Sequence, residues 1–254
     1  MRLLLVGDLI EDLTWHCECS RISPEAPVPI LTRLRRETSD GGAGLVAANL
    51  KGLDIDPVCI YGSKSLKERY YVGTHLVCRV DDDHVSRVPS VETYRKVKDT
   101  IPNVDAIIVS DYCKGTVDFS VASLCVKSGK PCFVDSKNSH IEWFRGDNVT
   151  LFPNTHEYER HVRGKESLFG AVIWKRGPLG CCVFTDRYKG VDIPSRKRSV
   201  ADVVGAGDAF LATYIWAYRQ GMDILEAARI ANDGAGVCVE HLGPYPLTEH
   251  DLKG

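Results

Sequence analysis

Short apolar runs alternate with longer stretches of helical periodicity along most of the chain. The runs predict strands at Leu3–Val6, Ala106–Val109, Cys132–Val134, Val149–Phe152, Val172–Trp174 and Cys181–Phe184. Helices are expected over Gly44–Leu53, Val117–Lys127, Thr155–Val162, Ala206–Tyr218 and Ile224–Val239. Such alternation is typical of strands joined by crossover helices in a mostly parallel sheet. Because the strands are apolar almost throughout, we expect an α/β fold whose sheet is covered by helices on both faces.

Two further stretches have a different pattern. Val28–Arg35 and Tyr70–Val80 are more alternating and are flanked by charge, which predicts a small antiparallel flap beside the main sheet. No repeat, low-complexity segment or linker divides the chain, and no apolar run approaches the ~18–20 residues that span a bilayer. We therefore expect one domain over residues 1–254, with a small lid contributed by about residues 12–36 and 70–81.

Polar residues follow four of the predicted strands. The strands lead into Gly7-Asp8, Ser110-Asp111, Asp135 and Pro153-Asn154. Each of these taken alone is readily explained as a turn former or helix cap. Parallel strands end at one edge of an α/β sheet, however, and that edge carries the ligand crevice. The recurrence therefore favours a functional site there.

The sharpest local signal is the segment from Gly205 to Asp208 before an apolar helix. Gly205, Ala206 and Gly207 predict a tight turn whose amides and helix dipole attract an anion such as phosphate. Asp208 either complements that dipole or removes a proton from a hydroxyl while a phosphoryl group arrives, and the residues alone leave both interpretations open. The segment is neither a Walker A loop nor a dinucleotide-binding fingerprint.

Two other motifs also have a structural and a functional interpretation. Asn154-Thr155-His156-Glu157 has the form of a capping box, which we favour, and the same Glu157 suits a water-coordinated magnesium ion. Gly41-Gly42-Ala43-Gly44 is either a flexible turn or a place where backbone approaches a polar ligand.

Charge and cysteine content exclude several classes of function. The 254 residues include 32 Lys and Arg against 34 Asp and Glu, so no strong field favours nucleic acid or an anionic membrane as partner. The ten cysteines contain no Cys-x-x-Cys pair, which argues against a structural zinc site. The chain opens without the pattern of a signal peptide, so we expect reduced thiols and a cytoplasmic protein.

Taken together, the motifs resemble those of ribokinase-like (PfkB-type) sugar kinases. They occur in that family's order along nearly the whole chain: Gly7-Asp8-x-x-x-Asp12, Gly41-Gly42-Ala43, Asn154-x-x-Glu157, Gly205-Ala206-Gly207-Asp208 and Ala231-Asn232. The resemblance implies a three-layer fold with a β-lid, and ATP and Mg²⁺ as cofactors. Ser20–Pro29 and Ser110–Gly115 are similar to the kinases of the bacterial ADP-heptose pathway. That similarity implies phosphorylation of D-glycero-D-manno-heptose 7-phosphate at its 1-hydroxyl.

The resemblance also implies a role for each matching residue. Asp208 matches the base, and the amides of Gly205, Ala206 and Gly207 match the anion hole. Asn154 and Glu157 match the motif linked to magnesium and nucleotide phosphates, with Glu157 acting through water. The remaining matches are Asp8, Asp12, Gly41 and Gly42 for the sugar, Arg21 and Lys114 for its phosphate, and Lys175, Gly177, Gly180, Asn232, Gly236 and Gly243 for ATP.

Two departures from the family pattern leave functions other than heptose phosphorylation open for this chain. Leu45 stands where the related heptose kinases carry an Asn that bonds the sugar. The stretch between Leu53 and His75 is much shorter than in the family, which implies a reduced lid and weakens the expectation of a lid-mediated homodimer. The alternatives are a kinase for another sugar or nucleoside, and a catalytically silent kinase-like protein that binds a sugar phosphate.

Overall fold

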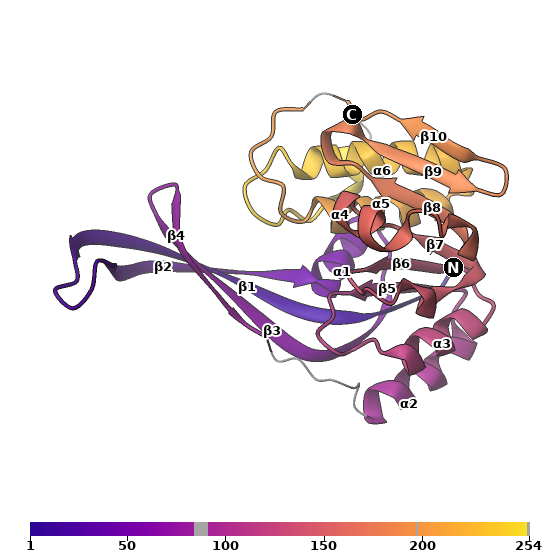
Figure 1. Ribbon diagram of the computed structural model, residues 1–254, viewed down its shortest axis with the longest axis horizontal. Coiled ribbons are helices and arrows are strands. Elements are labelled where there is room, and N and C mark those ends of the chain that lie inside the picture. Colours follow the sequence, from indigo (N-terminus) through magenta and orange to yellow (C-terminus); the bar gives the residue numbers. More distant parts are fainter. Residues whose placement is uncertain (84–90, 197, 253–254) are drawn as a thin grey trace.

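The computed structural model describes residues 1–83, 91–196 and 198–252, apart from the side chain of Ser63. The described strands form one sheet in the order β10-β9-β8-β7-β6-β5-β1-β3-β4, with β2 paired to β1 (Figure 1). The strands are β1 (Leu3–Ile22), β2 (Pro29–Gly42), β3 (Val58–Val72), β4 (His75–Asp82), β5 (Ala106–Asp111), β6 (Cys132–Ser136), β7 (Gly146–Leu151), β8 (Phe169–Lys175), β9 (Cys181–Thr185) and β10 (Lys189–Ile193). The helices are α1 (Ala43–Gly52), α2 (Val91–Thr100), α3 (Phe119–Lys127), α4 (Thr155–Glu157), α5 (Ala206–Arg219) and α6 (Ile224–Cys238).

The centre of the sheet is parallel, as the alternation of strands and helices predicts. β3, β1, β5, β6, β7 and β8 run in one direction, whereas β2, β4, β9 and β10 are antiparallel to their neighbours. The carboxyl ends of β5 to β8 therefore meet at one edge of the sheet.

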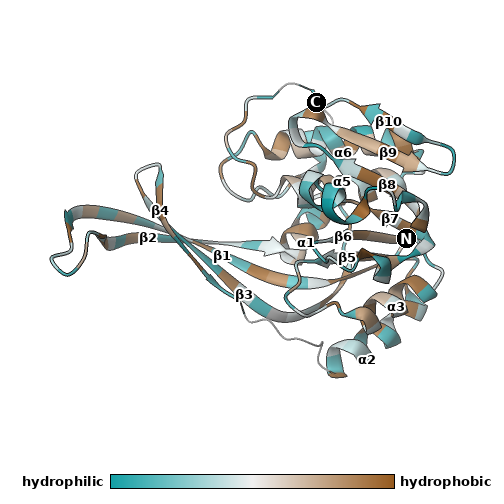
Figure 2. Cartoon of the chain, viewed as in Figure 1, coloured by the Kyte–Doolittle hydropathy of each residue, from teal (hydrophilic) through white to brown (hydrophobic). Residues whose placement is uncertain are grey.

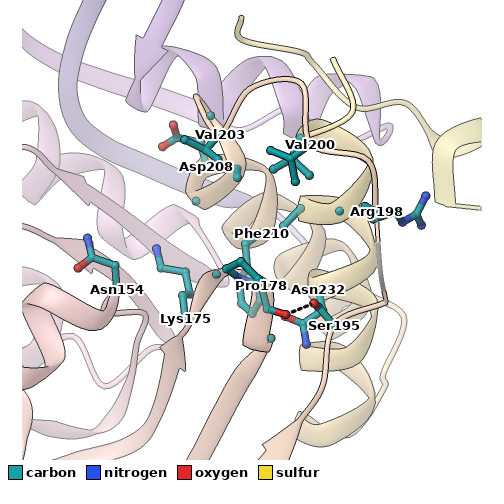
Figure 3. Close-up of a pocket in the computed structure, with 18 of the residues that line it drawn as sticks. Asn154, Lys175, Pro178, Ser195, Arg198, Val200, Val203, Asp208, Phe210 and Asn232 are labelled. Carbon is teal, nitrogen blue, oxygen red and sulfur yellow. Dashed lines mark hydrogen bonds between the residues drawn. The ribbon is translucent and has the colours of Figure 1, made fainter. Parts of the chain in front are cut away.

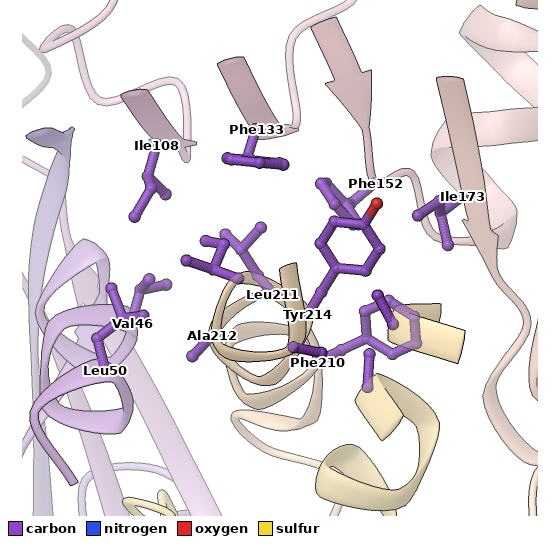
Figure 4. Packing of buried hydrophobic residues seen from close by; sticks show 14 of the residues in the cluster. Val46, Leu50, Ile108, Phe133, Phe152, Ile173, Phe210, Leu211, Ala212 and Tyr214 are labelled. Atoms are coloured by element: carbon purple, nitrogen blue, oxygen red, sulfur yellow. The ribbon is translucent and has the colours of Figure 1, made fainter. Parts of the chain in front are cut away.

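Two apolar clusters cover the two faces of the sheet and confirm the three-layer α/β fold. Leu3 and Leu5 belong to the cluster formed with α1, α5 and α6, and Leu4 and Val6 belong to the cluster formed with α2 and α3. This division follows from the two-residue period of a strand whose two faces are both buried. Figure 4 shows the first cluster, in which Tyr214 of α5 packs close to Phe152, the residue after β7.

One end of the sheet extends into a long ribbon, defined here as residues 9–42 and 64–82 (Figure 1). The strand predicted at Leu3–Val6 does not end at Gly7-Asp8 but continues to Ile22. It continues because β2 takes the place of β5 as its neighbour on one side, while β3 follows it on the other. Both residue ranges predicted for the lid lie in this ribbon. Its polar and apolar residues are mixed, in contrast to the apolar strands of the body (Figure 2).

Other element boundaries also differ from the sequence-based expectation. The helix predicted at Thr155–Val162 is one α-helical turn followed by a π-helical turn over Tyr158–Val162. Helix α2 was not predicted, because most of its residues are polar and only Thr93 and Val97 are buried. Throughout the described ranges, every helix is too short or too polar to span a membrane.

Candidate active site

A cavity of about 630 Å³ lies where β6 and β8 end and where α5 and α6 approach the sheet (Figure 3). Most of the residues predicted to form the site line it: Asn154, Lys175, Gly177, Gly180, Gly205, Ala206, Gly207, Asp208, Asn232 and Gly236. The cavity also takes in Tyr112, Asp135 and Lys137, to which no role was assigned from the sequence. Asp135 was detectable only as a polar residue at a strand end, and Tyr112 only as part of the Ser110–Gly115 motif.

Asp208 lies in the first turn of α5 and is 7% exposed. Its Oδ1 accepts a hydrogen bond from the Tyr112 hydroxyl at 2.9 Å. Burial, with the nearby Asp135 carboxylate, raises the pKa of Asp208 to about 7, although Tyr112, Lys175 and Lys137 favour the charged form. A carboxyl group that titrates near neutral pH is well matched to accepting a proton from a hydroxyl.

The turn before Asp208 requires glycine for two reasons. Gly205 caps the helix with a φ of 81°, in the left-handed region that favours glycine. A Cβ at Gly205 would also lie 2.7 Å from Cδ2 of Leu45. Leu45 therefore packs against the turn. The Ala206 amide donates to the Val203 carbonyl at 3.4 Å. The amides of Gly207 and Asp208 lie in the first turn of α5, where backbone N–H groups lack an intrahelical acceptor, and both residues line the cavity.

Positive side chains gather beside this helix terminus. A Cβ on Gly207 would lie 3.4 Å from the Lys175 ammonium, and that ammonium donates to Asp135 Oδ2 at 2.5 Å. The Lys137 ammonium is 3.5 Å from Glu157 Oε1 and 4.5 Å from the centroid of the Tyr112 ring. The helix dipole and Lys175 thus act together on any anion bound at Gly207, and Lys137 adds a positive charge to the lining of the same cavity.

The capping box predicted at Asn154 is confirmed. Asn154 Oδ1 accepts from the Glu157 amide at 3.0 Å, and Glu157 Oε2 accepts from the Asn154 amide at 2.8 Å. The Asn154 side chain also donates to Glu157 Oε1 at 2.6 Å. Glu157 is 7% exposed and, unlike Asn154, is not among the residues that line the cavity.

Asp8 is completely buried and lies outside the cavity lining. Its carboxylate accepts from the amides of Tyr112, Lys114 and Thr116 at 2.7, 3.0 and 3.0 Å. This geometry makes Asp8 the anchor of the 112–116 loop, which carries Tyr112 to Asp208. Oδ2 accepts two of these bonds and Oδ1 accepts one, so only Oδ1 keeps a lone pair for a further donor such as a sugar hydroxyl.

The other residues predicted to hold the sugar lie at the base of the ribbon. Asp12 pairs with Arg69, and a side chain at Gly41 would collide with the Asp12 carboxylate. Gly42 has a φ of 57° at the start of α1. Close contact with Asp12 at Gly41 and the positive φ of Gly42 account for these two glycines, and an approach of their backbone to a polar ligand stays a prediction.

Three further predicted residues also lie outside the cavity lining. Arg21 is exposed near the end of β1, thirteen residues beyond Asp8 and so roughly 40 Å along an extended strand. The Lys114 ammonium is paired with Asp83. The Gly243 amide donates to Asp202 Oδ2 at 3.0 Å and so supports the loop before Gly205.

Comparisons with solved structures show the same fold. Phosphofructokinase-2 of Escherichia coli in complex with potassium superposes with a TM-score of 0.78, at 13% identity over 99% of this chain and 96% of the other. Ribokinase of Thermotoga maritima gives a TM-score of 0.76, at 12% identity over 100% of this chain and 98% of the other.

Comparisons of sequence give similar proteins over the whole chain. The bifunctional protein HldE of Aeromonas salmonicida is 30% identical over 99% of this chain, and that of Proteus mirabilis is 28% identical over 99%. The chain spans 62% and 63% of the length of these two relatives. Residues 92–251, more than half of the chain, match the profile of the pfkB family of carbohydrate kinases. The chain therefore belongs to the pfkB family of carbohydrate kinases.

Proposed function

We propose that this kinase transfers the γ-phosphoryl group of ATP to the 1-hydroxyl of D-glycero-D-manno-heptose 7-phosphate, giving the 1,7-bisphosphate. The observation that carries the proposal is the Asp208 carboxylate, which lies in the first turn of α5 beside the Gly205–Gly207 amides and the Lys175 ammonium. The choice of heptose is supported by the resemblance of Ser20–Pro29 and Ser110–Gly115 to heptose kinases.

In this proposal Asp208 accepts the proton of the attacking hydroxyl. Phosphoryl transfer needs mainly positioning and stabilisation of charge on the transferred group. The amides at the start of α5 are fixed by the Gly205 turn, so they stabilise that charge without reorganising during the reaction. Lys175 adds a positive charge at the same place, and its ion pair with Asp135 fixes its direction.

The rest of the cavity suits a nucleotide. Val200, Val203 and Val239 give it an apolar wall for a base, and Lys175 lies toward the helix terminus where phosphates would bind. Asn232 donates to the Ile193 carbonyl at 3.1 Å, which ties α6 to β10 at the floor of this region. The cavity volume lies within the range of about 300–1,000 Å³ that is common for small-molecule sites.

The carboxylates present fit a magnesium ion held through water. Mg²⁺ commonly uses one or two carboxylates together with waters and substrate phosphates. Glu157 is held in a fixed orientation by Asn154, and Asp135 lines the cavity, so these residues would hold the ion. When bound, the ion supplies charge neutralisation between nucleotide phosphate oxygens.

A substrate panel tests the proposed activity. The chain would be incubated with ATP, Mg²⁺ and one of heptose 7-phosphate, fructose 6-phosphate, ribose or a nucleoside, and ³¹P NMR would follow the products. We expect ADP and a new anomeric phosphate resonance with the heptose phosphate.

A different best acceptor would replace heptose in the proposal and leave the kinase reaction intact. Calorimetric binding of a sugar phosphate with no ADP formation from any acceptor would instead favour the catalytically silent alternative.

Replacing Tyr112 by Phe should shift the pH dependence of the reaction. A base acts only when deprotonated, so kcat/KM should fall as the pH drops below the pKa of Asp208, which is about 7. The Tyr112 hydrogen bond favours the carboxylate, and its loss raises that pKa further. A hydrogen bond to a charged group contributes about 1.5–3 kcal/mol. We therefore expect the acid limb of the pH profile, the range in which kcat/KM falls as the pH drops, to move up by about one to two pH units.

The control is Tyr188→Phe, which alters a tyrosine in the β9–β10 turn far from Asp208. An acid limb at the same pH in Tyr112→Phe and in the control would show that the hydroxyl does not act on the base. The other charged groups near Asp208, namely Asp135, Lys175 and Lys137, are unchanged in both variants.

A further inference from the structure

Three cationic side chains share one face of the ribbon near its base. Lys67 of β3 is aligned with Asp12 of β1 and with Asp81 of β4. Two residues further along, Arg69 of β3 is aligned directly with Arg79 of β4. Because side chains two residues apart on a strand share a face, Lys67, Arg69 and Arg79 point to the same side. We call these three residues the ribbon cation group.

The charges in this group are not fully balanced. Like charges directly opposite each other on paired strands are destabilising, and Arg69 and Arg79 are in that arrangement. Each guanidinium has its own carboxylate, since Arg69 pairs with Asp12 and Arg79 donates twice to Asp81 at 2.6 Å. Lys67, in contrast, makes no hydrogen bond or ion pair with any residue that the structure describes.

The surroundings of Lys67 make an unpaired ammonium costly. The side chain is half-buried, and burial together with the two arginines lowers the pKa of its amino group, against the opposing effect of Asp12. A buried cation is stable only when an anion or suitable acceptors offset its lost hydration. The ribbon cation group therefore has the capacity to bind one more anion.

The position of Lys67 relative to Asp208 indicates which anion this is. The Lys67 ammonium lies 5.6 Å from the centroid of the Tyr112 ring, and the hydroxyl of the same tyrosine bonds Asp208. A single tyrosine side chain thus separates Lys67 from the proposed base. An acceptor whose reacting hydroxyl lies at Asp208 could extend along Tyr112 and present its far end to the ribbon cation group.

We propose that the ribbon cation group binds the phosphate monoester of the acceptor substrate, with Lys67 making the direct contact. This inference rests on the proposed function and deepens it. It assigns to Lys67 the role that sequence resemblance gave to Arg21 and Lys114. Arg21 lies far along the ribbon, and Lys114 already has Asp83 as its partner. A phosphate dianion is matched to this site because it can accept charge-assisted hydrogen bonds from both an ammonium and a guanidinium.

The test replaces Lys67 by Met, which keeps much of the side-chain length and removes the charge. The matched control is Lys64→Met, on the same strand, where the lysine is 50% exposed and pairs with Glu11. For the phosphorylated acceptor we expect kcat/KM to fall about 10- to 100-fold in Lys67→Met, mainly through KM, since a charge-assisted hydrogen bond is lost. The KM for ATP should stay unchanged, and Lys67→Arg should restore most of the acceptor affinity.

Binding of inorganic phosphate, measured by calorimetry, makes the test independent of turnover. We expect phosphate to bind the unmodified chain and the Lys64→Met control, and to bind Lys67→Met at least 10-fold more weakly. Equal phosphate affinity in the two variants, or an unchanged acceptor KM in Lys67→Met, would overturn the inference. Failure of every acceptor to react, with phosphate binding still dependent on Lys67, would instead contradict the proposed function and leave this anion site standing.

Discussion

Replacing Asp208 by Asn should lower kcat by about 10²- to 10⁴-fold, the range that a positioned base commonly contributes. The amide has nearly the same shape as the carboxylate, but it cannot accept the proton of the attacking hydroxyl. ATP affinity should be retained or slightly raised, because the substitution removes a negative charge beside the amides that would receive the phosphates. A coupled assay of ADP release gives the first quantity, and calorimetric titration with ATP gives the second.

The matched control for this variant is Asp186→Asn, which alters an exposed carboxylate in the β9–β10 turn. The control should keep full activity. If Asp208→Asn kept more than a tenth of the unmodified kcat, Asp208 would not be the base, and its burial in α5 would have to be explained by the helix dipole alone.

Replacing Asp8 by Ala should destabilise the chain and also impair the reaction. The substitution leaves three amides without their acceptor, those of Tyr112 and Lys114, which are partly buried, and that of Thr116, which is buried. Each unsatisfied buried donor costs about 1–3 kcal/mol, so we expect the free energy of unfolding to fall by about 3 kcal/mol or more. Urea denaturation followed by circular dichroism measures this change.

The effect on activity follows from the same loop. Without Asp8 the 112–116 loop loses its anchor, so Tyr112 no longer holds Asp208, and kcat should fall even at temperatures where the variant is folded. Asp8→Asn keeps one acceptor oxygen and should be intermediate in stability. An unfolding midpoint for Asp8→Ala equal to that of the unmodified chain would contradict the anchoring role.

The parts of the fold that depend on local pattern were predictable from the sequence. The strands β5 to β8 are apolar because both faces of the sheet are covered, and the helices between or after them have helical periodicity. The turn at Gly205–Gly207 was also predictable from the sequence. A left-handed residue before a helix favours glycine, so the glycine at position 205 itself indicates the turn.

The features that depend on long-range pairing were not predictable. β1 continues past Gly7-Asp8 only because β2 and β3 supply partners for it, and nothing within residues 7–22 specifies those partners. The ribbon cation group likewise exists only through the register that aligns Lys67 with Asp12 and Arg69 with Arg79. Tyr112 reaches Asp208 through hydrogen bonds to Asp8, which is more than a hundred residues earlier in the chain.

The central claim is that Asp208 and the first amides of α5 enclose the position of the transferred phosphoryl group. A crystal structure of the chain with ADP, aluminium fluoride as a mimic of that group, and heptose 7-phosphate would measure this directly. The account predicts the fluoride ligands within hydrogen-bond distance of the Gly207 amide, and an acceptor oxygen about 2.6–3.2 Å from an Asp208 carboxylate oxygen. A nucleotide bound with its phosphates directed away from Gly205–Gly207, or an acceptor oxygen with no contact to Asp208, would contradict it.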